Sequence, residues 1–219
     1  MLSSVSKYHT TPNGTETHFI AAGNASGPLT IQLHGLGGST ETFTPLLPHL
    51  SPDHNRIISV DFEGFGKTAL SSPDVQLSVT RYVEDLESLV TYLHESAERE
   101  PPKQHPGTLL IGHSLGSIVA MHYAARHPEQ IRGLILLGPG RSIAKIPATR
   151  ERMLDLAART REGGIVVAAD TAAVSNFPAD VSQDLRDSVR KAVRSCDAEA
   201  YARVCEAIAS LDYVDPSYA

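Results

Sequence analysis

The residues with the clearest chemical meaning are Gly-His-Ser-Leu-Gly at positions 112–116, which follow the apolar run 109–111. A helical pattern begins directly after them and continues to Arg126. Two glycines around a serine let the chain reverse tightly between a strand and a helix, because a Cβ at either glycine would collide with the neighbouring element. This turn, a nucleophile elbow, raises the serine oxygen above the end of a sheet. We therefore predict that Ser114 is a nucleophile and the only serine poised for acylation.

A second loop, His-Gly-Leu-Gly-Gly at positions 34–38, follows the apolar run 29–33. Its glycines allow a backbone N–H to point inward. The N–H groups of Leu36 and Leu115 are predicted to form an oxyanion hole, in which this loop and the residue after the nucleophile each supply one donor. Loss of one such donor typically costs about 3 kcal/mol of transition-state stabilisation. A plain tight turn is the alternative interpretation of the loop.

The sequence offers no evident base for this serine. In an elbow of this kind the catalytic acid and histidine follow the nucleophile along the chain. After Ser114 the only histidines are His122 and His127, which fall within or at the end of the helix that the elbow begins, and both are expected to point away from the serine oxygen. His34 is expected to hydrogen-bond within its own loop and His113 to pack against the sheet. Neither is therefore predicted to be a general base.

A third loop, Asp-Phe-Glu-Gly-Phe-Gly at positions 61–66, follows the apolar run 56–60. A carboxylate between a strand and a glycine turn most often accepts backbone N–H groups, so Asp61 is predicted to be structural. Glu63 lies on the same loop, where it could face the mouth of a pocket, but the side chain is expected to be exposed and solvated.

Length and composition narrow the class of protein. The chain has 219 residues, of which 41% are apolar, so it can bury one good core. Its net charge of −6 and pI near 5.9 argue against a nucleic-acid partner. No segment has the apolar core of a signal peptide or the length needed to span a bilayer, which predicts a soluble cytoplasmic protein without a membrane partner. Cys196 and Cys205 are expected to be reduced packing thiols, because their spacing puts them on different faces of a helical region.

The spacing of apolar residues predicts alternating strands and helices. Short apolar runs bounded by Gly, Pro or Asp are typical of strands buried on both faces of a parallel sheet, whereas apolar residues three and four apart indicate helices. The predicted elements are a hairpin around 11–14 whose second strand includes 17–21, strands at 29–33, 56–60, 109–111 and 133–137, and helices over 79–93 and 118–125. This alternation predicts the α/β class, with a mostly parallel sheet and flanking helices.

Beyond Gly138-Pro-Gly140 the strand pattern ends and helical patterns take over. We predict that residues 141–211 form a helical lid over the catalytic edge of a core made by residues 1–140, with Asp180 capping one of the lid helices. Residues 212–219 form a tail. The alternative is that the helices of 141–211 flank a longer sheet.

Together these motifs resemble those of the α/β-hydrolase superfamily in their usual order. The segments that carry the resemblance are 34–38, 61–66, 112–116 and His127-Pro-Glu-Gln-Ile-Arg-Gly-Leu-Ile-Leu-Leu-Gly138. Within that superfamily the chain is most similar to serine hydrolases of the 3-oxoadipate enol-lactonase type, through Gly138-Pro-Gly140 and Cys205-Glu-Ala-Ile-Ala-Ser-Leu-Asp-Tyr213. The resemblance implies a small carboxylic ester, lactone or enol-lactone as substrate, with no cofactor or metal.

The sequence departs from the family after the predicted lid. Family members continue with two further strand units, which deliver the catalytic Asp and then the catalytic His. Here only 212–219 follow, and Asp212 and Asp215 come before the point where the first unit should begin. The last strands of the fold are therefore expected to be absent (truncated), activity to be impaired, and strand 133–137 to be an exposed edge that invites self-association. Two other interpretations stay open: a catalytically inactive remnant that at most binds a small acyl compound, and a carbon–carbon bond hydrolase, which shares the serine arrangement.

Overall fold

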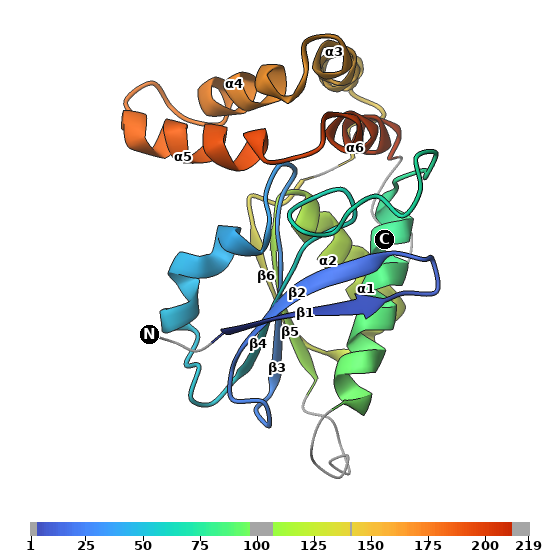
Figure 1. Ribbon diagram of the computed structural model, residues 1–219, viewed down its shortest axis with the longest axis vertical. Coiled ribbons are helices and arrows are strands. Elements are labelled where there is room, and N and C mark those ends of the chain that lie inside the picture. Colours follow the sequence, from blue (N-terminus) through green and yellow to red (C-terminus); the bar gives the residue numbers. More distant parts are fainter. Residues whose placement is uncertain (1–3, 97–106, 141, 212–219) are drawn as a thin grey trace.

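A six-stranded sheet forms the centre of the molecule, with the strand order β1-β2-β4-β3-β5-β6 (Figure 1). The computed structural model describes residues 4–96, 107–140 and 142–211, so the predicted tail 212–219 lies outside the described residues. The strands are β1 (Ser4–Thr10), β2 (Glu16–Gly23), β3 (Leu29–Leu33), β4 (Arg56–Val60), β5 (Thr108–His113) and β6 (Ile131–Leu137). β2 pairs antiparallel with β1 and β4, whereas β4, β3, β5 and β6 run parallel. The predicted α/β class with a mostly parallel sheet is confirmed.

The first two strands form the predicted hairpin. In its turn the Thr11 N–H donates to the Thr15 carbonyl at 2.9 Å, and Gly14 takes a φ of 79°, which glycine adopts without strain. The register places Tyr8 opposite His18 and Ser6 opposite Ile20. Since β1 pairs with β2 alone among the described strands, it is one edge of the sheet.

Helices connect the parallel strands and cover them. They are η1 (Thr40–His49), α1 (Val79–Glu95), α2 (Leu115–Arg126) and η2 (Pro128–Gln130), followed by α3 (Pro147–Gly163), α4 (Ile165–Ser175), α5 (Gln183–Arg194) and α6 (Ala198–Ser210). α1 and α2 pack against each other, and α2 contacts β3, β5 and β6. Because helices connect successive parallel strands, the sequence alternates between apolar runs and helical stripes.

The core lies between the sheet and these helices. Ile31, Leu33, Ile58 and Leu110 on the central strands are fully buried, and burial of each such side chain stabilises the fold by about 1.5–3 kcal/mol. The apolar stripe predicted for the helix over 79–93 is buried along its whole length. Both observations confirm that hydrophobic spacing identified the elements correctly.

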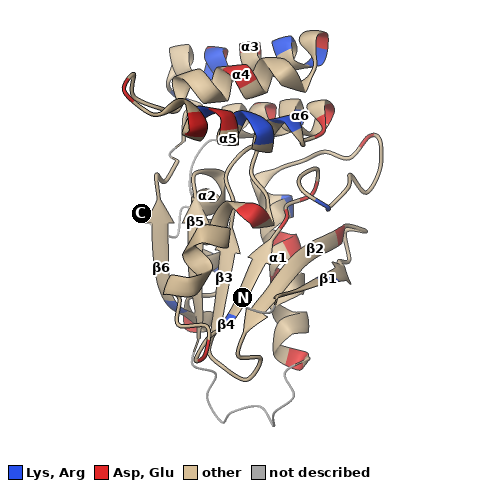
Figure 2. Ribbon diagram, turned by 60° about the vertical axis from the view of Figure 1, so that its left-hand side comes forward, with Lys and Arg blue, Asp and Glu red and all other residues tan. Residues whose placement is uncertain are grey.

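The last four helices, α3 to α6, form a layer beyond the carboxyl ends of the parallel strands (Figure 1). The loops that leave β3 and β4 touch this layer directly. A Cβ on Gly37 would lie 2.8 Å from Val193 Cγ2, and a Cβ on Gly64 would lie 2.5 Å from Ala200 Cβ. The glycines therefore let α5 and α6 approach the sheet edge closely. Figure 2 shows acidic and basic residues interspersed along the outer helices.

The start of α5 differs from the sequence prediction. The helix begins after Ser182, so Asp180 is not its N-cap. The Val181 N–H donates to the Pro178 carbonyl at 3.3 Å, which places this segment in a turn before the helix. An aspartate does cap the next helix, because the Asp197 carboxylate accepts from the Ala200 N–H at 2.8 Å.

β6 is the other edge of the described sheet, and its outer residues are apolar. Ile135 and Leu137 are each 42% exposed, and no described strand pairs with the far side of β6. An edge strand offers unpaired backbone N–H and C=O groups, and apolar side chains beside them favour pairing with another chain.

We expect the purified chain to self-associate through this edge. Ile135→Lys is expected to shift the mass measured by light scattering during gel filtration towards the monomer, because a charge on an edge strand opposes pairing. Leu185→Lys is the matched control, since Leu185 is 53% exposed but lies on α5 rather than on the edge strand. A parent chain that is already monomeric, or an equal effect of the two lysines, would contradict this assignment.

Candidate active site

Ser114 stands between β5 and α2 in a backbone conformation that few non-glycine residues adopt. Its φ is 50° and its ψ is −110°, and among the described residues only Ser51 is another non-glycine residue with positive φ. A Cβ on Gly112 would lie 2.5 Å from the Gly116 carbonyl oxygen, and the Ser114 N–H donates to the Leu137 carbonyl at 3.0 Å. Strain held in place by surrounding structure is typical of a functional turn.

The loop after β3 passes directly over this serine. A Cβ on Gly35 would lie 3.2 Å from Ser114 Cβ. Leu36 follows in the same loop, and Leu115 is the first residue of α2. Neither the Leu36 N–H nor the Leu115 N–H has a hydrogen-bond acceptor within residues 4–96, 107–140 and 142–211. The structure thus brings the two loops together, and the oxyanion role of these two N–H groups stays a prediction.

His34 cannot accept a proton from Ser114. The Phe62 N–H donates to His34 Nε2 at 3.1 Å, so the proton of the imidazole is on Nδ1, which lies 2.7 Å from the Gly35 carbonyl oxygen. Full burial lowers the pKa of His34, which keeps the ring neutral. The prediction that this histidine hydrogen-bonds within its own loop is confirmed.

His113 differs from its prediction. It is exposed rather than packed against the sheet, and it lines an open pocket of about 370 Å³ together with Leu137. The remaining wall comes from Thr42, Phe43, Pro45 and Leu46 of η1. His113 is the last residue of β5, and its ring lies beside the glycine loop, since a Cβ on Gly35 would lie 2.7 Å from His113 Nδ1.

The other two histidines after the elbow lie within α2 and at its end. His127 Nε2 lies 2.9 Å from Glu87 Oε1, and His122 is buried within the helix. Ser114 Oγ has no hydrogen-bond partner in the part of the chain that the structure describes. Within that part, no imidazole is hydrogen-bonded to the Ser114 hydroxyl.

Asp61 holds the loop after β4, as predicted. Its carboxylate accepts from the Thr40 N–H at 2.5 Å and from the Lys67 N–H at 2.9 Å. It also lies 2.6 Å from Nδ1 of His18. A Cβ on Gly66 would collide with this carboxylate at 2.2 Å, which explains the glycine at that position.

His18, which contacts Asp61, also contacts Ser6, and neither residue was identified from the sequence. His18 is fully buried, and its Nε2 lies 2.7 Å from Ser6 Oγ. Only the hairpin register brings Ser6 and His18 together, because they are 12 residues apart in the chain. No sign of this contact is visible in the sequence, and the prediction that Ser114 is the only serine poised for acylation stays a prediction.

Glu63 is buried, so the prediction that it is exposed and solvated is wrong. Oε2 lies 2.5 Å from Arg81 Nε and accepts from Thr15 Oγ1 at 3.0 Å, while Oε1 accepts from the Ser71 N–H at 2.7 Å. Burial alone would raise the pKa of Glu63, but the hydrogen bonds from Arg81 and Ser71 outweigh burial and lower it. The carboxylate therefore joins the first hairpin to α1.

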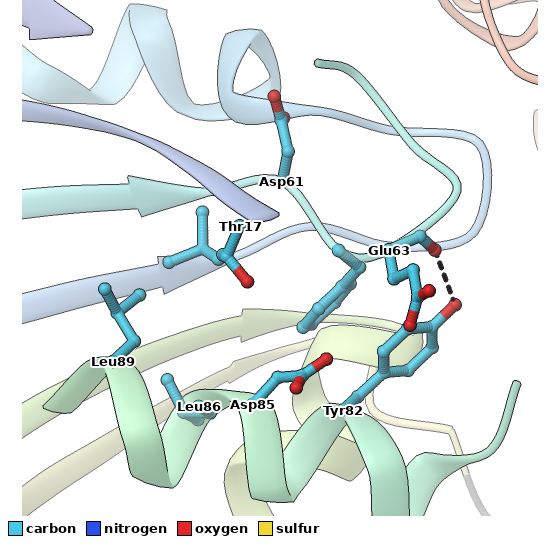
Figure 3. A pocket seen from close by; sticks show the side chains of 9 residues that line it. Thr17, Asp61, Glu63, Tyr82, Asp85, Leu86 and Leu89 are labelled. Atoms are coloured by element: carbon cyan, nitrogen blue, oxygen red, sulfur yellow. Dashed lines mark hydrogen bonds between the residues drawn. The ribbon is translucent and has the colours of Figure 1, made fainter. Parts of the chain in front are cut away.

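A small cavity beside Glu63 is too narrow for a substrate. Its volume is about 10 Å³, which is room for about one water molecule. Figure 3 shows Asp85 pointing into it and Asp61 pointing away, with the Tyr82 hydroxyl donating to the Glu63 carbonyl. Burial raises the pKa of Asp85 despite its hydrogen bond from Thr11.

Loss of the Glu63 charge is expected to destabilise the fold. Glu63→Gln should lower the free energy of unfolding by about 3 kcal/mol, because it leaves the partly buried Arg81 without its counter-ion. The folded pKa of Glu63 lies below its ordinary value of 4.5, so this stabilisation is complete above pH 4.5 and is lost as the pH falls through the folded pKa. Urea unfolding at pH 7 and pH 3 should show a difference between parent and variant that narrows in acid. The exposed Glu84→Gln is the control, and an equal loss in both variants would contradict the assignment.

Cys196 and Cys205 are free and buried, which confirms that they are packing thiols. Burial raises the pKa of each to about 12, so neither is a reactive thiolate at neutral pH. In the described ranges no cluster of His, Cys, Asp and Glu could hold a metal ion, and no helix there is long and apolar enough to cross a membrane.

A family model described as the alpha/beta hydrolase fold matches residues 28–181 of the sequence. The chain belongs to the α/β-hydrolase family. The matched range contains the loops after β3 and β4 and the elbow, and the loop after β3 is the one that contacts Ser114.

Two curated proteins of known name are similar to this chain over part of their length. The chain is 27% identical over 164 residues to 2-hydroxy-6-oxo-6-(2'-aminophenyl)hexa-2,4-dienoic acid hydrolase of Metapseudomonas resinovorans, which covers 68% of this chain and 52% of the relative. It is 31% identical over 122 residues to a Bacillus subtilis protein described as a putative 2-succinyl-6-hydroxy-2,4-cyclohexadiene-1-carboxylate synthase, covering 56% of this chain and 40% of the relative. The matches thus span about half or less of these relatives' lengths.

Solved structures share the fold over nearly the whole chain. The enol-lactonase from Burkholderia xenovorans LB400 superposes with a TM-score of 0.78 at 24% identity, covering 94% of this chain and 75% of that one. A carboxylesterase structure from Nitrososphaera gargenis gives a TM-score of 0.79 at 19% identity, covering 93% of this chain and 72% of that one. At these identities the likeness is one of fold.

Proposed function

We propose that this chain carries the nucleophile and the oxyanion site of a serine hydrolase for small carboxylic esters, lactones or enol-lactones. Ser114 is the nucleophile in this proposal, and the N–H groups of Leu36 and Leu115 bind the developing oxyanion. The observation that carries it is the strained elbow, with its positive φ at Ser114 and the glycine loop packed against it. The enol-lactonase and esterase fold neighbours support this choice of substrate class.

The apolar pocket beside the elbow fits a small substrate. It is lined by His113, Leu137 and four residues of η1, and most of this lining is apolar. Pockets with few polar groups suit acyl chains or lactone rings, whose carbonyl is the only strongly polar part. We propose that the acyl part of the substrate lies here.

We also propose that residues 142–211 act as the lid of this site. The Val193 and Tyr201 side chains lie against the glycine loop that carries Leu36. A layer at this position excludes water from the oxyanion site and limits the size of the substrate. The packing of the helices over the carboxyl ends of the strands favours this role over that of helices flanking a longer sheet (Figure 1).

Turnover by these residues alone is proposed to be slow. A serine hydroxyl is a weak nucleophile unless a base accepts its proton, and none of the described residues is placed to do so for Ser114. A catalytically inactive remnant that binds a small acyl compound is the limiting case of this proposal.

Carbon–carbon bond hydrolysis is the second candidate. The Metapseudomonas resinovorans relative is named as the hydrolase of a hydroxy-oxo-dienoic acid. The compound in that name has neither an ester nor a lactone bond. A binding competition between a small lactone and a hydroxy-oxo-dienoic acid distinguishes the two candidates. The compound that binds the pocket more tightly indicates which class of substrate the site accepts.

A fluorophosphonate, which reacts covalently with nucleophilic serines, tests the assignment of Ser114. After prolonged incubation we expect peptide mapping to find an adduct on Ser114 that disappears in Ser114→Ala. Ser117→Ala is the matched control, because Ser117 is fully buried and its hydroxyl donates to the Gly112 carbonyl at 2.7 Å. An unmodified Ser114 in a chain that is labelled elsewhere would overturn the proposal.

A further inference from the structure

A serine, a histidine and an aspartate form a continuous hydrogen-bonded array away from the elbow. Ser6 Oγ lies 2.7 Å from His18 Nε2, and His18 Nδ1 lies 2.6 Å from Asp61 Oδ2. The three residues come from β1, from β2 and from the loop after β4. This order of contacts, hydroxyl to Nε2 and Nδ1 to carboxylate, is the one that activates a serine.

The contacts of Asp61 fix the direction of this array. Its carboxylate accepts from the backbone N–H groups of Thr40 and Lys67, and the oxygen that accepts from Lys67, Oδ2, also faces His18 Nδ1. The proton of this contact is therefore placed on His18 Nδ1, and in the neutral imidazole Nε2 is then an acceptor. The Ser6 hydroxyl must then donate to Nε2.

In this array the histidine and the aspartate are buried and the serine is exposed, as a nucleophile requires. His18 is 0% exposed and Asp61 is 1% exposed, so water does not compete for their hydrogen bond. Ser6, in contrast, is exposed on the edge strand, where a reagent can reach it. The Tyr8 ring, whose centroid is 5.1 Å from that of His18, covers the imidazole on the same strand.

We propose that Ser6 is a second acylation site, distinct from Ser114, which reacts with small activated carboxylic and phosphonic esters. In the reaction Ser6 Oγ bonds to the acyl carbon or to phosphorus, its proton passes to His18 Nε2, and the bond to the leaving group breaks. The leaving alcohol takes that proton, whereas fluoride or a nitrophenolate departs as the anion and the proton passes to water. No described element encloses Ser6 in a pocket, so we expect a lasting covalent adduct rather than rapid turnover.

The test uses a fluorophosphonate on the Ser114→Ala chain, so that its outcome does not depend on the proposed function of the elbow. We expect one adduct, placed on Ser6 by fragmentation of the N-terminal peptide. It should be lost in Ser6→Ala and kept in Ser4→Ala, which changes a neighbouring exposed serine of the same strand. Labelling of Ser4, or of no serine in this peptide, would overturn the proposal.

A second variant asks whether His18 acts as the base. His18→Gln is expected to slow labelling of Ser6 by about 100-fold or more, which is the typical contribution of a general base. Thermal unfolding shows whether this variant still folds; if it does not, the comparison of Ser6→Ala with Ser4→Ala decides alone. A folded His18→Gln chain labelled at the parent rate would show that the contact between Ser6 and His18 is only structural.

Discussion

Gly116→Ala is expected to abolish the stable fold, although it adds a single methyl group. The new Cβ would lie 2.1 Å from the Leu33 carbonyl oxygen and 2.7 Å from that of His34. Both atoms belong to the backbone at the end of β3, so no side-chain rotation relieves the clash. Either β3 or α2 must move. Overpacking typically costs about 1–3 kcal/mol, and because this clash is with backbone atoms we expect the loss here to exceed about 4 kcal/mol.

Gly133→Ala is the matched control for this change. Gly133 lies on β6, and a Cβ there would meet only Leu109 Cδ1 at 3.4 Å, which is ordinary contact. We expect it to alter the free energy of unfolding by less than about 1 kcal/mol. Soluble yield and the urea midpoint measure both variants, and equal midpoints would show that the elbow is not packed as tightly as described.

The largest expected effect concerns catalysis. Loss of one member of a serine triad typically lowers turnover by about 10⁴- to 10⁶-fold, and what then remains comes from the oxyanion hole and binding. Since His34 is engaged through both ring nitrogens and His127 pairs with Glu87, neither can replace the base. We therefore expect the chain to hydrolyse p-nitrophenyl acetate barely above the uncatalysed rate.

The fold and the sharp turn at Ser114 could be predicted because both depend on local sequence. The runs 29–33 and 56–60 are strands with these bounds, since each is apolar and each ends at a His or Asp that begins a glycine loop. The elbow needs glycine on both sides of Ser114 for steric reasons, and this need is visible in five residues.

The polar contacts could not be predicted, because they join residues distant in sequence. Glu63 looks like a loop glutamate, yet its partners Thr15 and Arg81 lie 48 and 18 residues away. Ser6 and His18 meet only through the hairpin register, which a turn motif alone does not fix. The prediction for His113 failed for a local reason. His113 is the last residue of β5, and the alternation of buried and exposed side chains along a strand does not extend to the residue where the sheet ends.

Steady-state hydrolysis of p-nitrophenyl acetate by the parent chain and by Ser114→Ala tests most directly whether Ser114 has a base. We expect both rates to lie close to the uncatalysed rate, because no base for Ser114 is found among the described residues. A parent chain that turns over this ester at an ordinary enzymic rate, of about 1–10³ s⁻¹, and loses that rate in Ser114→Ala would contradict this expectation. Such a result would show that a base for Ser114 exists within this sequence.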